Sequence, residues 1–283
     1  MGASGGRDRG TQARPDGVTG AAAARVREPL GFTLRGAFRM WQRNVTVGRR
    51  TILTTLGPRF VEAIAYLLIM GLGLGTYVAT INGVDYVEFI APGVAASTVM
   101  FGSILETTYN AFVRINVRRV YEAVVTTPLS VGDVVVGEYL WATTRAVAYG
   151  IVFLVVMAAM GLVSSAWVLL VPLVFIPGAL CFAVIGMAYT SYATSIEHFN
   201  IFFTGLLTPM FLFGGVFFPF DDLPGWAQVV GWCLPLSHLV AATRDMVLGD
   251  VSWLTLGHVG ALIAVTLAVF WFPLRRIGRK IVN

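Results

Sequence analysis

Charged side chains are scarce in this chain of 283 residues. Only 12% of the residues are Asp, Glu, Lys or Arg, whereas 57% are hydrophobic and the mean hydropathy is +0.76. Soluble domains carry roughly 25% charged residues, so a large part of the charge that a water-facing surface needs is missing. This shortage excludes an ordinary soluble enzyme, and the long apolar runs indicate a helical membrane protein.

Lysine is nearly absent, because Lys280 is the only one among 20 basic residues. The phosphate-binding loop G-x-x-x-x-G-K-[S/T] needs a lysine followed by Ser or Thr, and Ile281 follows Lys280. The sequence therefore lacks this ATP-binding loop. Gly71, Gly73 and Gly75 lie within an apolar run, where close helix packing explains them better than phosphate binding.

Cysteine and histidine are also rare. Two cysteines, Cys181 and Cys233, are too few for a disulfide framework. The three histidines, His198, His238 and His258, stand apart, and no His or Cys pair has the spacing of metal ligands. No serine has a plausible general base nearby in the sequence, so we predict no metal site and no catalytic residue on this chain.

Six apolar runs are long enough to cross a bilayer, for which roughly 20 residues are needed. They cover about residues 60–80, 89–112, 137–162, 167–193, 199–220 and 251–273. Pro172 and Pro177 lie in the fourth run, where we expect tilt or a kink. The sequence therefore predicts an all-α membrane protein with six transmembrane helices.

The basic residues predict the orientation of these helices. Eighteen of the 20 lie before the first run, between the second and the third, or after the sixth, with Arg145 and Arg244 as the exceptions. The opposite connections carry the carboxylates of Asp85, Glu88, Asp221, Asp222 and Asp250. Both termini are therefore expected in the cytoplasm, and the net charge of +5 indicates contact with membrane lipid rather than with nucleic acid.

The N-terminal part divides into a tail and an amphipathic segment. Residues 1–28 are rich in Gly, Ala and Arg without the apolar core of a signal peptide, which predicts a disordered cytoplasmic tail before a transmembrane domain over 29–283. Leu30–Val45 has an apolar helical face backed by Arg35, Arg39 and Arg43. We expect an interfacial helix in the cytoplasmic headgroup layer. The alternative is a charged flank that only sets the topology.

Two short apolar stretches, Gly225–Cys233 and Leu236–Leu248, follow the fifth run. Each is too short to cross a bilayer, and prolines separate them. We therefore expect external re-entrant or interfacial helices that cap the bundle. The candidate residues of this cap are Pro224, Trp226, Pro235 and His238.

Ionisable residues within or beside apolar runs are the next candidates, because burying them in lipid is costly. They are Arg59, Glu62, Glu106, Glu138 and Arg145. We expect interhelical or interfacial ion pairs near the cytoplasmic surface. The alternative is a proton relay.

The connection between the second and third runs reads VRINVRRVYEAVVTTPLSVGDVVVGEYL over residues 113–140. The pattern predicts a charged cytoplasmic helix that ends at Pro128 and Ser130, with Asp133 suited to the first turn of the next helix. Such a helix suits docking of a partner. A plain connector with topology-setting arginines is the alternative.

These strings resemble the membrane subunit of ABC-2 type exporters. The likeness rests on TPLS-x-x-D-x-x-x-G-E from residue 127 onward and on FFPFDDLPGWAQVVGWCLPLSH over 217–238, with Ala91-Pro92-Gly93 and residues 106–110 in support. It covers about residues 30–280 and is greatest to the branch with the nodulation-factor export permease and the daunorubicin-type drug-resistance permeases. Such permeases have six spans, an interfacial N-terminal helix, a coupling helix and re-entrant helices after the fifth span.

The resemblance also implies partners. Two permeases, here expected as a homodimer, pair with two copies of a separate ATPase subunit that binds ATP and Mg, in the bacterial cytoplasmic (inner) membrane. The implied coupling residues are Arg114, Arg118, Arg119, Tyr121, Glu122, Thr127, Pro128 and Leu129. No cofactor is expected on this chain.

The expected function is export of an amphiphilic or hydrophobic substrate, such as a drug, a glycolipid or an oligosaccharide-type molecule. Candidate residues of the substrate path are Phe202, Phe203, Met210, Phe211 and Phe213, for which helix packing is the alternative. Rival hypotheses are an ion-coupled secondary transporter working without an ATPase and a membrane enzyme acting on lipid-linked substrates.

Overall fold

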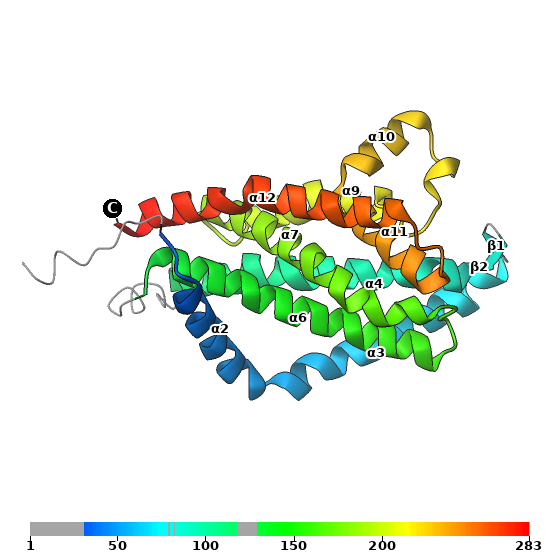
Figure 1. The fold of residues 1–283 in the computed structure, drawn as a ribbon, viewed down its shortest axis with the longest axis horizontal. Helices are drawn as coiled ribbons and strands as arrows, with labels where there is room; N and C mark the ends of the chain where they lie inside the picture. The colour runs from blue at the N-terminus through cyan, green and yellow to red at the C-terminus, as the bar shows by residue number, and fades with distance from the viewer. Residues whose placement is uncertain (1–30, 79, 82, 118–128, 283) are drawn as a thin grey trace, which may run out of the picture.

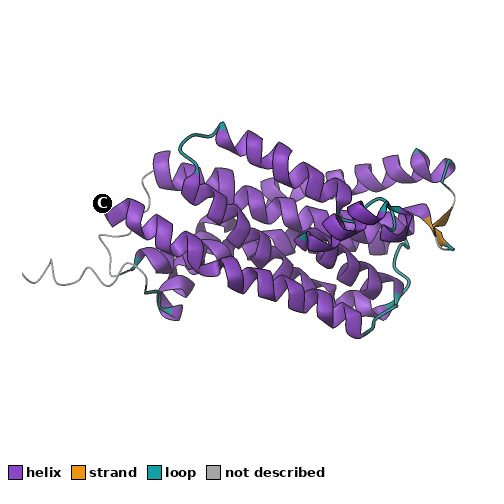
Figure 2. Cartoon of the chain, turned by 90° about the horizontal axis from the view of Figure 1, so that it is seen from above, coloured by secondary structure: helices purple, strands orange, loops and turns teal. Residues whose placement is uncertain are grey.

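Nearly all of the described chain is helical, and most helices run along the long axis of the molecule (Figures 1 and 2). The computed structural model describes residues 31–78, 80–81, 83–117 and 129–282. The prediction of an all-α fold is confirmed for these residues apart from one small hairpin. In it, Thr80–Ile81 (β1) pairs antiparallel with Val84–Asp85 (β2) between the first two long helices.

The helical elements follow one another with short connections. They are α2 (Leu34–Arg49), α3 (Ile52–Leu72), η1 (Leu74–Thr76), α4 (Tyr86–Leu105), η2 (Glu106–Asn110), η3 (Val113–Val117), α6 (Val131–Ala159), η4 (Ala166–Leu170), α7 (Val171–Tyr192), α8 (His198–Phe202), η5 (Phe203–Leu207), α9 (Thr208–Phe213), η6 (Phe220–Asp222), α10 (Gly225–Cys233), α11 (Pro235–Leu248) and α12 (Trp253–Val282). The segments η2, η3 and η5 are π-helical, and helix continues on both sides of η2 and η5, so these two segments widen helices rather than end them.

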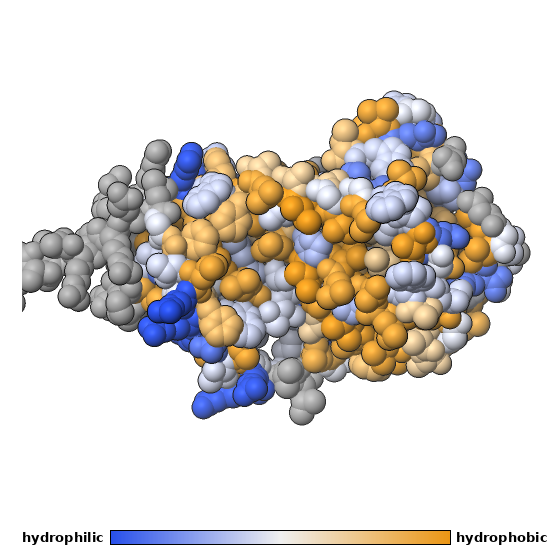
Figure 3. Space-filling model, in the orientation of Figure 1, coloured by the Kyte–Doolittle hydropathy of each residue, from blue (hydrophilic) through white to orange (hydrophobic). Residues whose placement is uncertain are grey.

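Five helices in the described part of the chain are long and apolar enough to cross a membrane. They cover Thr54–Thr76, Tyr86–Ile115, Val131–Ala159, Ala166–Tyr192 and Trp253–Gly278. These helices correspond to the first, second, third, fourth and sixth predicted runs. Orange apolar side chains cover the middle of the molecule, while blue side chains lie toward both ends, including the end that carries α2 (Figure 3).

The predicted C-terminal end of the fifth span, at residue 220, is wrong. The continuous helix covers only His198–Phe213, which at 1.5 Å per residue is roughly 24 Å long. It stops before Gly215, whose φ of 71° lies in the left-handed region that favours glycine. The aromatic residues up to Phe220 therefore turn away instead of extending the helix, and six full-length spans are not found among the described residues.

Two other predicted boundaries need correction. The first long helix begins at Ile52 rather than at residue 60, so Arg59 lies within it. The third begins at Val131 rather than at residue 137, because Ser130 caps it. The Ser130 hydroxyl accepts from the Asp133 N–H at 3.1 Å, and the Asp133 carboxylate accepts from the Ser130 N–H at 2.9 Å, a capping box. This confirms the predicted helix start after the proline and the serine.

The core lies between α4, α6, α7 and α11. In its most apolar window α4 is 78% buried, whereas the corresponding window of α3 is only 11% buried. Because water would not wet the apolar side chains that α3 leaves outside, this helix needs lipid or another protein surface around it.

Helix α2 crosses the N-terminal half of α6 at short range. A Cβ atom on Gly137 of α6 would lie 2.6 Å from the Met40 Cβ, and one on Gly36 of α2 would lie 2.4 Å from the Asp133 carboxyl carbon. The Asp133 carboxylate also accepts from the backbone N–H of Thr33, the N-cap residue of α2, at 2.5 Å. One buried carboxylate therefore joins the first turns of two helices.

The predicted amphipathic helix over Leu30–Val45 exists but is displaced, since α2 covers Leu34–Arg49. Its buried face consists of small or flexible residues, Gly36, Ala37, Met40 and Asn44. Leu34 is 79% exposed and Phe38 is 50% exposed. The apolar side that was predicted to face the membrane is thus largely exposed, apart from Ala37, and the prediction missed the neighbouring face that packs on α6.

The close crossing predicts that Gly137→Ala destabilises the fold by about 1–3 kcal/mol, because the added methyl group needs space that Met40 occupies. Gly257→Ala in α12 is the matched control, since a Cβ there meets nothing within 4 Å. There alanine is expected to be neutral or slightly stabilising. Thermal unfolding midpoints of the purified variants in detergent measure both. Equal midpoints for the two variants would contradict the close crossing.

Candidate functional site

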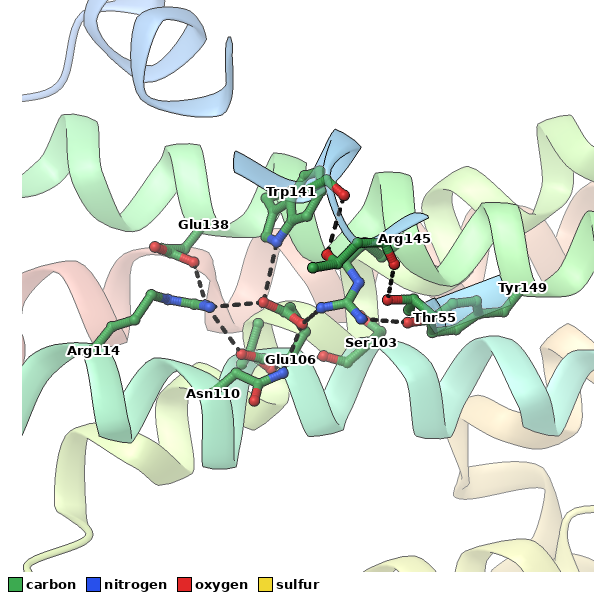
Figure 4. A network of polar contacts seen from close by, with 12 residues as sticks. Thr55, Ser103, Glu106, Asn110, Arg114, Glu138, Trp141, Arg145 and Tyr149 are labelled. Atoms are coloured by element: carbon green, nitrogen blue, oxygen red, sulfur yellow. Dashed lines mark hydrogen bonds and ion pairs between the residues drawn. The ribbon is translucent and has the colours of Figure 1, made fainter. Parts of the chain in front are cut away.

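A buried cluster of charged side chains lies where α4 passes into its π-helical extension and crosses α6. Glu106, the first residue of η2, is 2% exposed, and Glu138 of α6 is completely buried. Arg114 of η3 and Arg145 of α6 reach toward these carboxylates (Figure 4). The π-helical widening lies at this cluster, as π-bulges frequently do at functional sites.

Arg114 connects the two carboxylates. Its Nη1 donates to the Glu106 Oε1 at 2.8 Å, and its Nη2 donates to the Glu138 Oε2 at 2.6 Å. Two neutral donors also reach Glu106: the Asn110 Nδ2 at 2.8 Å and the Trp141 Nε1 at 3.1 Å. Glu106 is therefore held from its own helix and from α6 at the same time.

Arg145 completes the cluster from the other side. One of its guanidinium nitrogens donates to the Glu106 Oε2, and the other donates to the Tyr149 hydroxyl at 2.5 Å. The guanidinium of Arg59 lies 4.9 Å from the centre of the Tyr149 ring, within the range of a cation–π contact. Arg145, an exception to the predicted charge pattern, is thus accounted for as an internal partner.

Two carboxylates and two guanidinium groups balance one another, and we call Glu106, Arg114, Glu138 and Arg145 the charge quartet. The quartet confirms the prediction of interhelical ion pairs for Glu106, Glu138 and Arg145, whereas Arg114 was predicted only as a coupling residue. The pair between Arg59 and Glu62 at 2.6 Å is also present, but it joins neighbouring turns of one helix, and the Glu62 side chain is 60% exposed. Surface pairs of this kind stabilise little.

The predicted coupling segment falls largely outside the described residues. Arg118, Arg119, Tyr121, Glu122, Thr127 and Pro128 all lie in the range 118–128. Of the two that are described, Arg114 belongs to the charge quartet, and Leu129 is a partly buried residue packed in the cluster around α2 and α6. Docking by this segment stays a prediction.

Both flanks of that segment are tied to the bundle. Before it, Arg114 binds Glu106 and Glu138. After it, the Ser130 hydroxyl donates to the Gly31 carbonyl at 2.8 Å, and Asp133 holds Thr33. A displacement of the segment would therefore reach α4, α6 and α2 through direct polar contacts.

The five candidates of the substrate path lie on α8, η5 and α9. Phe202 stacks on Tyr189 at 4.3 Å between ring centres, and Phe211 contacts Phe101 at 5.6 Å. Phe203 lies against Tyr109 at 5.5 Å, Met210 is 2% exposed, and Phe213 lies 6.1 Å from Trp226. Packing against α4, α7 and α10 accounts for these positions, and contact with a substrate stays a prediction.

The predicted cap forms two helices at the expected place. Pro224 is the N-cap residue of α10, Pro235 is the first residue of α11, and Trp226 is 64% exposed. Helix α10 stands off the bundle at one end, while α11 packs between α4 and α12 (Figure 1). The bounds predicted from the prolines are confirmed to within one residue, whereas the external position of the cap stays a prediction.

Arg244 connects α11 to the rest of the bundle. Its guanidinium donates to the Phe89 carbonyl at 3.1 Å and to the Gly215 carbonyl at 2.8 Å, and it lies 3.9 Å from the centre of the Phe89 ring. The carbonyl of Gly215 belongs to the turn that ends the short fifth helix. Arg244, the second exception to the predicted charge pattern, is therefore a structural cation that holds this turn.

His238 and His258 form a contact that no sequence pattern indicates, and their Nδ1 atoms lie 3.0 Å apart. The Trp232 ring stacks on His258 at 5.4 Å. Burial lowers the pKa of His238, and the neighbouring His258 lowers it further. The pair links α11 to α12 across a turn, so a search for metal-ligand spacing along one helix misses it. No group of three or more metal-binding side chains lies within the described residues.

Comparison with known proteins identifies relatives along most of the chain. The model of the ABC-2 type transporter family matches residues 36–248. Nodulation protein J of Rhizobium meliloti (strain 1021) is 33% identical over 245 residues, which cover 86% of this chain and 92% of the relative. Nodulation protein J of Rhizobium leguminosarum bv. trifolii is 35% identical over 86% of this chain and 93% of the relative. The inner membrane transport permease YadH of Escherichia coli K12 is 24% identical over 85% and 94%.

The charge quartet predicts that Glu106→Gln destabilises the fold by about 3–5 kcal/mol, because the partly buried Arg145 then loses its carboxylate partner and Arg114 keeps only Glu138. Glu62→Gln is the control, since it breaks an exposed pair worth at most about 1 kcal/mol. Adding Arg145→Gln to Glu106→Gln rebalances the charge and is expected to recover part of the loss. Thermal unfolding in detergent compares the three variants, and equal midpoints for Glu106→Gln and Glu62→Gln would refute the quartet.

Proposed function

The chain belongs to the ABC-2 type transporter family, and from this premise we propose that it is the membrane-spanning subunit of an ATP-driven exporter. Family membership makes it a transporter permease subunit, and the apolar helices make it a multi-pass membrane protein. A relative described as an inner membrane transport permease supports the bacterial inner membrane as its place. Relatives called nodulation protein J match nearly their whole length.

Two features together support an ATP-driven complex: the phosphate-binding loop is missing, and a charged segment is present between the second and third spans. The sequence lacks the lysine-containing phosphate-binding loop, so ATP and Mg bind a separate ATPase subunit. The charged segment at 113–130 offers a docking element for that subunit, and its two flanks are fixed to α4, α6 and α2. We assign two ATPase copies and a second, identical permease to the complex.

Energy transfer then follows a short physical route. Nucleotide binding favours one arrangement of the ATPase pair, and only a difference in binding between two states supplies energy for transport. Arg114 and Ser130 pass the displacement of the docking segment to the helices on either side. The helices of the two permeases reshape a path for an amphiphilic or hydrophobic substrate, for which Phe202, Phe203, Met210, Phe211 and Phe213 are the candidate contacts.

The orientation belongs to the same proposal. The short helix His198–Phe213 serves as the fifth pass, which places both termini in the cytoplasm and α10 outside. The beginning of α2 and the C-terminus lie at the same end of the bundle, and α10 lies toward the other (Figure 1), which supports an even number of passes. Irregular backbone after Phe213 is compatible with a membrane only where protein surrounds it, and Arg244 occupies the carbonyls there.

The ion-coupled alternative loses support in the structure. A proton relay needs a carboxylate that changes its protonation within the membrane. Glu106 and Glu138 are both paired with arginine, and the third buried carboxylate of the described residues, Asp133, accepts hydrogen bonds from Thr33 and Ser130. Two of these ion pairs join the extension of α4 to α6, which supports a role in connecting helices.

The docking assignment predicts that Arg118→Ala and Glu122→Ala reduce substrate-stimulated ATP hydrolysis about tenfold or more, as loss of an interface contact worth at least 1.4 kcal/mol would. The measurement uses vesicles containing the permease and its cognate ATPase, with the ATPase alone as reference. Arg275→Ala is the matched control, because Arg275 is exposed near the C-terminal end of α12 and lies outside the docking segment. Full stimulation in both docking variants would overturn the assignment.

The proposed orientation predicts that a membrane-impermeant maleimide labels Cys233 in intact cells, because this cysteine is exposed on α10. Cys181 is buried and should stay unlabelled. A cysteine at Thr46 of α2, placed in a Cys233→Ser background, should react only after the cells are opened. Labelling of Thr46→Cys in intact cells would contradict a cytoplasmic α2.

A further inference from the structure

A cavity of about 570 Å³ opens between α2, the beginning of α3, η2 and α6. This volume lies within the range of sites for small molecules, roughly 300–1,000 Å³. Its wall includes the Glu106 side of the charge quartet, so it borders the part of the chain that fixes α4 to α6. None of the five candidate residues of the substrate path lines it.

The charge along this cavity is positive. Four arginines and one carboxylate line it. Arg114 and Arg145 are balanced by Glu106 and Glu138, whereas Arg43 and Arg49 lie within 4 Å of no carboxylate of the described residues. Both of these arginines are exposed, so their charges face whatever enters. The surplus of two positive charges favours an anionic ligand over a neutral one.

The rest of the wall is apolar and amphipathic. Aliphatic side chains from three helices contribute, among them Val45 of α2, Leu56 of α3 and Ala148 of α6. Two indole rings are fixed in place, because Trp41 donates to the Thr144 hydroxyl at 3.0 Å and Trp141 donates to Glu106 at 3.1 Å. A free inorganic anion would leave this apolar surface uncovered. A ligand with both an anionic group and a hydrocarbon part covers both kinds of wall.

We propose that this cavity binds an anionic phospholipid, with the phosphate held by Arg43 and Arg49 and an acyl chain against the apolar wall. Arginine with tryptophan is the side-chain set that lies at headgroup depth in membrane proteins. The bound lipid would contact α2, α3 and α6 together and so stabilise their arrangement by binding the folded state alone. The proposal concerns this chain by itself and needs no ATPase, so it can fail while the proposed function stands.

The test measures thermal unfolding of the full-length protein in a neutral detergent during titration with three probes. Dioctanoyl phosphatidylglycerol is expected to raise the unfolding midpoint in a saturable manner. Dioctanoyl phosphatidylcholine has the same chains without net negative charge, and inorganic phosphate has the charge without chains; neither is expected to match it. An equal shift with phosphatidylcholine, or with phosphate, would overturn an anionic lipid as the ligand.

Two paired variants locate the site. Arg43→Gln with Arg49→Gln should raise the half-saturating concentration of phosphatidylglycerol on the order of tenfold or more, because each arginine near anionic lipid contributes about a factor of five. Arg35→Gln with Arg39→Gln removes the same charge from the same helix, but these residues do not line the cavity, so affinity should be retained. Equal weakening in both variants would reduce the effect to general surface charge and overturn the proposal.

A third variant keeps every charge and fills the apolar part of the cavity. Ala148→Leu adds volume to the cavity wall on α6 and should weaken phosphatidylglycerol binding without changing the response to inorganic phosphate. Unchanged lipid binding in this variant would show that the acyl chain lies elsewhere. Because Arg43 and Arg49 are exposed, their replacement should leave the midpoint without lipid nearly unchanged, which separates binding from folding.

Discussion

The structure depends on compensating buried charge. Glu106 and Glu138 lie at 2% and 0% exposure among apolar helices, where an unpaired carboxylate would cost several kcal/mol. Arg114 and Arg145 supply the opposite charges, one from the extension of α4 and one from α6. Because neither pair can separate without leaving a buried charge, the relative position of these two helices is fixed at this level. The quartet therefore acts as a junction between the core helices and the segment that follows Arg114.

A second junction joins α6 to α2. It also depends on a buried carboxylate, but its partners are hydrogen-bond donors rather than arginines. Asp133 accepts from its own helix start and from Thr33, the N-cap residue of α2. Glycines at the crossing let the two helices approach, so the carboxylate is covered by packing rather than by water. The two junctions stand on either side of residues 118–128. Under the proposed function, a displacement of this segment would pass through the two junctions to α2, α4 and α6.

The same elements explain where sequence reasoning succeeded and where it failed. Prolines and the serine before Asp133 fixed the starts of α6, α10 and α11, because capping and ring geometry are local properties. The end of the fifth helix was misplaced, because apolar composition continues to Phe220 while a left-handed Gly215 turns the chain. The packing face of α2 was missed for a related reason: its buried side is small and slightly polar, and only the glycine contacts to α6 make it the packing face.

The amino-acid sequence alone determined the class of this protein, the existence of its long apolar helices, the missing ATP-binding loop and the family. These properties depend on composition, periodicity and short motifs, which neighbouring residues carry. The tertiary structure decided which charges meet: Arg145 with Glu106, Arg244 with the carbonyl of Gly215, and His238 with His258. These partners lie 20 to 39 residues apart on different helices or in a turn, and they share no common spacing along the chain. Only the packing of the helices brings them within bonding distance.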